Sequence, residues 1–208
     1  MHTKFATAIL LSVLPIPGDA TLAVSQTISM EQQMTDNVMQ ADRFWDLIGR
    51  TTKRRGDQDA QMEALRYELR KLSAEDIEAF ERAFQAQQRR AYSWDLWGAA
   101  YVMNGGASDD GFEYFQRWLI SRGRETFEAA LADPDSLAAT AGSDTDDGFD
   151  FESFAYVAGD VWREKTGRQG RSPSTGVPQA PQPSGVPFEE DPDHLSRRYP
   201  KLWAKFGQ

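Results

Sequence analysis

The chain contains no cysteine, and only two of its 208 residues are histidines, His2 and His194. The absence of cysteine excludes disulfide bonds, thiolate catalysis and zinc sites with cysteine ligands. Both histidines lie outside the segments predicted to form the core, so a Ser-His-Asp hydrolase would lack its general base. The sequence also has no Walker motif and no nucleophile elbow, which excludes the enzyme classes that depend on them.

Only one long apolar run is present, and it lies near the N-terminus. Lys4 precedes the largely apolar segment 5–14, and small residues follow it, which is the outline of a secretory signal. The run is too short to span a bilayer. The alternative is that residues 1–35 are an extension from an upstream start codon, with translation beginning at Met30 or Met34. Both interpretations stay open on the pattern alone.

Basic residues are scarce, with 23 Lys and Arg against 32 Asp and Glu, giving a formal net charge of -9. This balance argues against nonspecific binding to nucleic acid or to an anionic membrane. The acids concentrate in residues 106–161, where thirteen acids meet three bases and the net charge is -10. Residues 162–208 carry a net charge of +3, so the tail is weakly attracted to this acidic body.

Apolar residues recur at helical spacing through the middle of the chain, which predicts an all-α fold, a compact bundle of about six helices. Ser73 and Ser108 are placed as N-caps, and the glycines after Asn104 are placed as a helix C-cap. The predicted helices lie at about 36–49, 58–72, 74–91, 92–103, 109–120 and 149–165, with a further short segment at 124–131.

The predicted domain organisation has a helical core at 36–165, followed by a flexible linker at 166–190 that is rich in Pro, Gly and Ser. Residues 191–208 recover helical spacing and are apolar on one side. We therefore expect a C-terminal helix that docks on the core, with Pro200 dividing it from the turn before it.

Several segments resemble a bacterial family known as domain of unknown function 4240, over about residues 36–165. The resemblance implies a start shortly before Phe44, which favours Met34 and a cytoplasmic location; secretion is the alternative if residues 1–23 are a signal. The family name implies no activity. The segments that carry the resemblance are 44–48, 94–101, 104–106, 108–112 and 118–120.

The aromatic residues around the predicted glycine turn either form core or wall a ligand pocket. Trp97 and Trp118 are expected nearest any pocket, because glycines beside them leave room. Asn104 and Ser108 would orient a ligand, and nearby arginines, including Arg124, would contact an anion. The full set of candidate binding residues is Trp97, Asn104, Ser108, Asp109, Asp110, Glu113, Arg117, Trp118 and Arg122.

Asp109, Asp110 and Glu113 also allow a hard divalent cation, which prefers oxygen ligands. In the alternative interpretation, the two aspartates complement the positive end of a helix. Asp144, Asp146 and Asp150 do not form an EF-hand, because the required glycine and the bidentate glutamate are misplaced. Beyond this cation, no cofactor is predicted.

Two functional hypotheses follow. In the first, the chain is a soluble, non-enzymatic binding module whose acidic face, residues 109–152, attracts a basic protein partner. In the second, it is a metal-dependent enzyme or a small-molecule binder with its site at Asp109, Asp110 and Glu113. The sequence does not set the oligomeric state.

Overall fold

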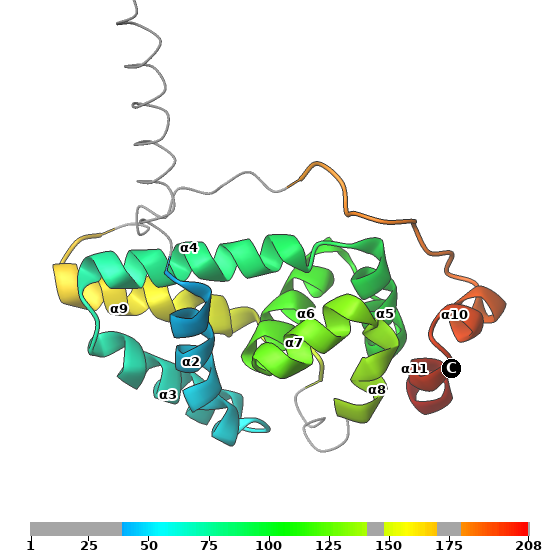
Figure 1. Cartoon of the computed structure of the whole chain (residues 1–208), viewed down its shortest axis with the longest axis horizontal. Helices are drawn as coiled ribbons and strands as arrows, with labels where there is room; N and C mark the ends of the chain where they lie inside the picture. The colour runs from blue at the N-terminus through cyan, green and yellow to red at the C-terminus, as the bar shows by residue number, and fades with distance from the viewer. Residues whose placement is uncertain (1–38, 141–147, 170–179, 208) are drawn as a thin grey trace, which may run out of the picture. The chain divides into compact units, whose positions relative to one another are not determined.

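The computed structural model describes residues 39–140, 148–169 and 180–207 (Figure 1). Within these ranges the chain forms ten α-helices, three short 3-10 helices and no strand beyond an isolated bridge, which confirms the all-α fold. The expected number of helices was too low, because several helices are too short to show helical periodicity. The signal-like segment, Asp144 and Asp146 lie outside the described residues.

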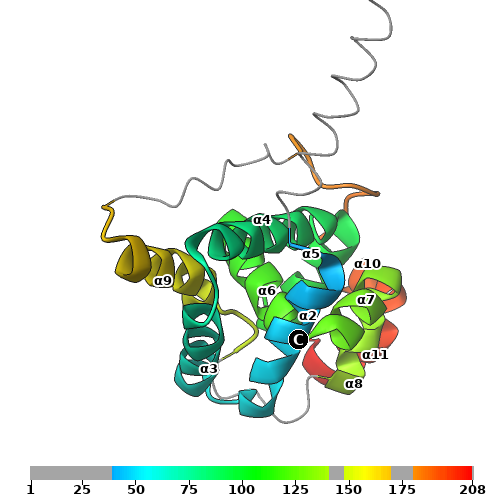
Figure 2. The ribbon, with the colours of Figure 1, turned by 60° about the vertical axis from the view of Figure 1, so that its left-hand side comes forward.

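The first part of the bundle consists of α2 (Ala41–Thr51), α3 (Gln58–Arg70), α4 (Ala74–Arg90) and α9 (Tyr156–Thr166). The 3-10 helix η1 (Thr52–Arg54) follows α2. α4 packs along α9, and α3 and α9 lie side by side (Figure 2). Apolar faces hold these helices together: the rings of Phe44 and Phe80 lie 5.1 Å apart between α2 and α4. The N-cap predicted at Ser73 is confirmed, since its hydroxyl accepts a hydrogen bond from the Asp76 backbone N–H at 3.1 Å.

The second part is built on α5 (Trp94–Asn104) and α6 (Asp109–Ser121). Ser93 and Ser108 cap their N-termini, each hydroxyl accepting a backbone N–H at 3.2 Å. Gly105 ends α5 with φ at 66°, a left-handed conformation that glycine adopts without steric cost. The predicted order of helix, glycine turn and helix is therefore correct, and it fixes the angle between α5 and α6.

The helix expected to start at Phe149 begins later. Phe149 and Phe151 are both buried, residues 148–151 are not helical, and the Phe151 N–H donates to the Tyr114 carbonyl at 3.1 Å. A 3-10 turn, η3 (Glu152–Ala155), comes next, and α9 starts only at Tyr156. The apolar residues from Phe151 to Trp162 predicted a helix from Phe149, whereas the hydrogen bond to α6 holds Phe151 outside the helix.

Between these parts, α7 (Arg124–Ala132), η2 (Pro134–Ser136) and α8 (Leu137–Thr140) lead toward the C-terminal helices. The docking of the C-terminal segment is confirmed, but as two helices, α10 (Pro192–Arg198) and α11 (Pro200–Phe206). Tyr199 lies between them, because the residue before a proline is disfavoured in helical conformation. The described residues, from Met39 to Gly207, belong to one compact unit.

Tyr199 anchors this C-terminal pair to α5. Its side chain is 2% exposed, and its hydroxyl donates to the Asp95 carbonyl at 2.9 Å. The ring lies so close to Gly98 that a Cβ there would be 2.2 Å from the tyrosine oxygen. Glycine at position 98 is therefore required by close approach of the tail.

Asp135 holds the start of α11 from a distant part of the chain. Its buried carboxylate accepts the backbone N–H groups of Lys201, at 3.0 Å, and Leu202, at 2.8 Å. The Lys201 ammonium also lies 3.8 Å from Asp133. The weakly basic tail thus lies on the acidic body, as its charge suggested.

The predicted linker, 166–190, includes a segment with defined contacts. Ser184 accepts the Trp94 N–H at 2.9 Å and donates its own N–H to the Tyr92 carbonyl at 3.1 Å. Residues 170–179 lie outside the described residues. A membrane-crossing helix is absent from the described part of the chain, since none of its helices has the necessary length and apolar character.

Candidate functional site

A cavity of about 180 Å³ opens beside the N-terminus of α6, and we call it the acidic pocket. It combines an aromatic floor, a rim of carboxylates and one amide. Four of its residues were predicted from the sequence as candidate binding residues. Its lining consists of Tyr92, Trp97, Asp109, Asp110, Phe112, Glu113 and Gln116.

The floor consists of three roughly parallel rings, and Trp94, which does not line the pocket, stacks in turn on Trp97 with centroids 5.2 Å apart. Trp97 stacks on Phe112 with centroids 4.8 Å apart, and Tyr92 stacks on Phe112 with centroids 6.2 Å apart. Phe112 is 1% exposed, so the outer two rings cover it. The Trp97 indole N–H donates to the Ala107 carbonyl at 3.0 Å, which fixes the indole against the glycine turn. This hydrogen bond and the stacking on Phe112 hold the Trp97 ring in place.

The rim carries three carboxylates from the first two turns of α6. Asp109, Asp110 and Glu113 are all exposed, and the two aspartates occupy the turn directly after the Ser108 cap. The positive end of the helix stabilises negative charge there. Glu113 is also paired with the guanidinium of Arg117, one turn further along α6. Within the described residues, Asp109 and Asp110 form no ion pair, whereas Glu113 is partly neutralised by Arg117.

Gln116 closes the inner side of the pocket. It is 2% exposed, and its amide nitrogen donates to the Gln88 carbonyl of α4 at 3.2 Å. Sequence reasoning missed Gln116 and Tyr92. The spacing held a signal for Gln116, which lies one helical turn after Phe112, whereas Tyr92 sits in the short connection between α4 and α5 and follows no periodic pattern.

Asn104 and Ser108, expected to orient a ligand, have structural roles. The Asn104 side-chain oxygen accepts the Phe149 N–H at 3.3 Å, tying the segment before α9 to the end of α5. Ser108 caps α6. Neither residue lines the acidic pocket.

The candidate residues farther along α6 lie inside the protein. Trp118 is 2% exposed, and Arg117 is 7% exposed, with its guanidinium donating to the Glu152 carbonyl at 2.8 Å. Arg122 is 4% exposed and donates to the Gln61 amide oxygen at 3.2 Å, within a buried polar network below α2 and α3. Arg124 is exposed and pairs with Asp42 at 2.6 Å. The structure therefore brings Trp97 and the three acids together in the acidic pocket, and none of the arginines lines it, although Arg117 pairs with Glu113 from within the protein.

Across the described ranges, no three His, Asp or Glu side chains are grouped closely enough to hold a metal ion. The divalent cation considered at Asp109, Asp110 and Glu113 stays a prediction.

Comparison with known proteins gives one result. No curated protein and no solved structure matches the chain. A family model does match over residues 39–164, a span that includes every residue lining the acidic pocket. The chain accordingly belongs to the family described as protein of unknown function, DUF4240.

Proposed function

We propose that the chain is a binding protein whose acidic pocket receives the lysine or arginine side chain of a basic protein partner. The observation that supports this function is the combination in one cavity of three carboxylates with a floor of stacked aromatic rings. Carboxylates attract a cation, and the ring of Tyr92, at the end of the stack, attracts it further while the floor covers its alkyl stem.

The binding energies expected at the acidic pocket are too small for a single basic side chain to bind tightly on its own. A cation over an aromatic face contributes about 0.5–1 kcal/mol at an exposed site and about 2 kcal/mol when water is excluded. An exposed ion pair contributes about 0.2–1 kcal/mol. A partner would therefore present several basic residues, and its association would be accelerated by the acidic surface and weakened by salt.

The surface available to such a partner is narrower than the whole acidic segment 109–152. Asp135 is buried under α11, and Asp133 faces Lys201. Glu128 pairs with Arg90 at 2.7 Å, which lowers the pKa of that carboxyl. Among the described residues, Asp109 and Asp110 at the start of α6 have no such partner, whereas Glu113 pairs with Arg117. We therefore place the partner surface at the acidic pocket.

A peptide-binding measurement tests this proposal. The probe is fluorescein-labelled hexalysine, with labelled hexaglutamate as the control peptide, followed by fluorescence anisotropy. The site variant is Asp109→Asn/Asp110→Asn. The matched control is Asp59→Asn/Glu75→Gln, which removes two exposed acids from the first turns of α3 and α4.

We expect hexalysine to bind the wild type, and the site variant to weaken binding by about tenfold, since two ion pairs of up to about 1 kcal/mol each are lost. The control variant should weaken binding by less than about twofold through the change in net charge alone. Equal losses in both variants would show that hexalysine senses only the overall charge, and the proposal would be wrong. A further variant, Tyr92→Leu, should also weaken binding, because it removes one ring of the floor and leaves the charge unchanged.

A further inference from the structure

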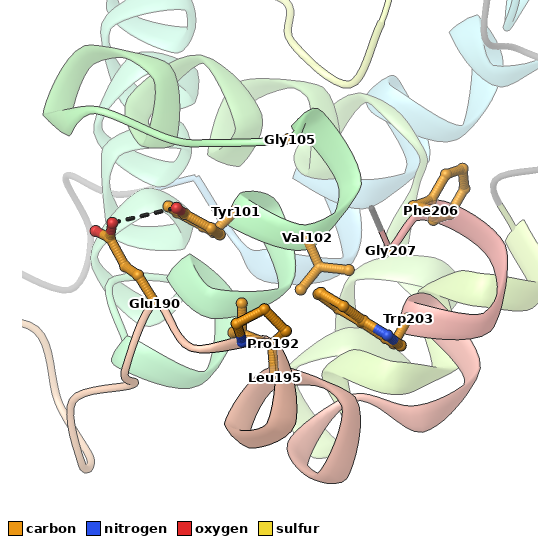
Figure 3. A pocket seen from close by; sticks show the side chains of 9 residues that line it. All are labelled: Tyr101, Val102, Gly105, Glu190, Pro192, Leu195, Trp203, Phe206 and Gly207. Atoms are coloured by element: carbon orange, nitrogen blue, oxygen red, sulfur yellow. Dashed lines mark hydrogen bonds between the residues drawn. The ribbon is translucent and has the colours of Figure 1, made fainter.

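A second cavity of about 180 Å³ lies where α10 and α11 meet α5, and we call it the terminal pocket (Figure 3). Its residues come from two distant parts of the chain. Those from the C-terminal segment lie beyond residue 164, where the match to the family model ends. The lining consists of Tyr101, Val102, Gly105, Glu190, Pro192, Leu195, Trp203, Phe206 and Gly207.

The walls of the terminal pocket are mostly apolar. Val102 and Leu195 are 3% and 2% exposed, and Figure 3 shows Pro192 and the Trp203 ring beside them. Such a surface holds a compact hydrocarbon group by removing it from water. A buried apolar cavity of about 150 Å³ is enough to bind benzene. The terminal pocket therefore has room for a single ring with a short substituent.

One end of the pocket is polar. The Tyr101 hydroxyl donates to a carboxylate oxygen of Glu190 at 3.1 Å, drawn as the dashed line in Figure 3. Burial raises the pKa of Tyr101, and the hydrogen bond to Glu190 raises it further, so the phenol stays a protonated donor. Glu190 is the one acid of the lining. With the tyrosine hydrogen already directed at Glu190, this end offers a ligand acceptor oxygens and a negative charge.

We propose that the terminal pocket binds a small primary amine with a compact apolar group, such as an arylalkylammonium ion. The ammonium would donate to Glu190 and to the Tyr101 oxygen, and the apolar group would lie against Trp203 and Leu195. The charge complementarity with Glu190 and the apolar walls select this class over neutral or anionic ligands of the same shape. This site is separate from the acidic pocket and does not depend on the function proposed for it.

Calorimetric titration of the full chain tests the proposal with three probes of similar shape: phenethylammonium, 2-phenylethanol and 3-phenylpropionate. The site variant is Glu190→Gln, which keeps an acceptor for Tyr101 and removes the charge. The matched control is Glu189→Gln, because Glu189 is an adjacent exposed acid that does not line the pocket.

We expect phenethylammonium to bind at least about tenfold more tightly than the alcohol, since a hydrogen bond to a charged group is stronger than one between neutral groups. The carboxylate probe should not bind. Glu190→Gln should remove the preference for the amine, and Glu189→Gln should leave it unchanged. Equal affinity for amine and alcohol, an equal loss in the two variants, or no binding of phenethylammonium would each overturn the proposal.

Discussion

Replacing Asp135 with alanine should release the C-terminal helices from the core. Asp135 is 6% exposed, and its carboxylate accepts the N–H groups of Lys201 and Leu202 in the first turn of α11. No side chain within the α11 segment caps this turn, and Pro200 at its first position has no N–H to offer. The carboxylate therefore acts as the N-terminal cap of α11, from a position 66 residues earlier in the sequence.

The expected cost follows from these two hydrogen bonds. Loss of a helix N-cap costs about 0.5–2 kcal/mol. Leu202 is fully buried, so its N–H would be left without a partner in a place water does not reach, at about 1–3 kcal/mol. We therefore expect Asp135→Ala to lower the free energy of unfolding by about 2–4 kcal/mol. Asp135→Asn should cost less, because its amide oxygen still accepts one N–H.

Urea denaturation would measure the global effect, and amide hydrogen exchange at Leu202 would measure the local one. Lys201→Ala is the control. Its ammonium is 66% exposed and lies 3.9 Å from Asp135, so this ion pair should contribute less than about 1 kcal/mol. If Asp135→Ala changed stability by less than about 0.5 kcal/mol and left exchange at Leu202 unaltered, the capping role would be refuted.

Three further predictions concern α5, Tyr199 and the acids of α6. Gly98→Ala should lower the free energy of unfolding by about 1–3 kcal/mol in urea denaturation, because the added Cβ would meet the Tyr199 hydroxyl. Combining it with Tyr199→Phe should recover part of this loss, since the hydroxyl is then absent. Burial raises the pKa of Tyr199 to about 12, so folding favours the neutral phenol. The stability that this preference contributes is complete below pH 10.0 and is lost as the pH rises to about 12. The alkaline unfolding profile of Tyr199→Phe should lack this pH-dependent loss. The last prediction concerns thermal-shift measurements with Mg²⁺, Mn²⁺, Ca²⁺ and Zn²⁺ on the wild type and on Asp110→Ala. We expect none of these cations to raise the Tm of the wild type through Asp110. A rise in the wild type that is absent in Asp110→Ala would favour the hypothesis of a metal-dependent enzyme or small-molecule binder.

Much of the helical framework follows from local chemistry and could be predicted. Ser73 and Ser108 each accept the N–H three residues later, and Gly105 takes the left-handed conformation that ends a helix. These signals act over a few residues, so they are visible in the sequence. The break at Pro200 was predictable for the same reason.

The contacts that depend on distant residues could not be predicted. In the sequence, Asp135 is indistinguishable from the other acids of the acidic segment. In the structure it is buried and caps α11. Ser184 lies in a composition typical of a linker, and its pairing with Tyr92 and Trp94 has no local signature. Phe151 is held outside the helix by a hydrogen bond to the Tyr114 carbonyl, which overrides the helical tendency of its neighbours.

In the candidate site, too, local features could be predicted from the sequence, and features that depend on distant contacts could not. Helical spacing correctly grouped Asp109, Asp110 and Glu113 at the start of one helix. Trp97 was expected near a pocket because glycines beside it leave room, and it lines the acidic pocket, whereas Trp118 does not. Helical spacing did not reveal that Arg117 and Arg122 are buried, because a long basic side chain at the edge of an apolar face can point either way. It also did not reveal the terminal pocket, which exists only once α10 and α11 have docked.

The most direct test of the proposed function uses the tryptophan indole N–H signals in a ¹H–¹⁵N spectrum, titrated with hexalysine. Trp97 lies in the floor of the acidic pocket, Trp203 lines the terminal pocket, and Trp45 and Trp162 are buried elsewhere. We predict that the Trp97 signal shifts in a saturable way while those of Trp45, Trp162 and Trp203 stay in place. Binding that moves Trp203 and leaves Trp97 unchanged, or that moves no indole signal at all, would contradict recognition of a basic partner at the acidic pocket.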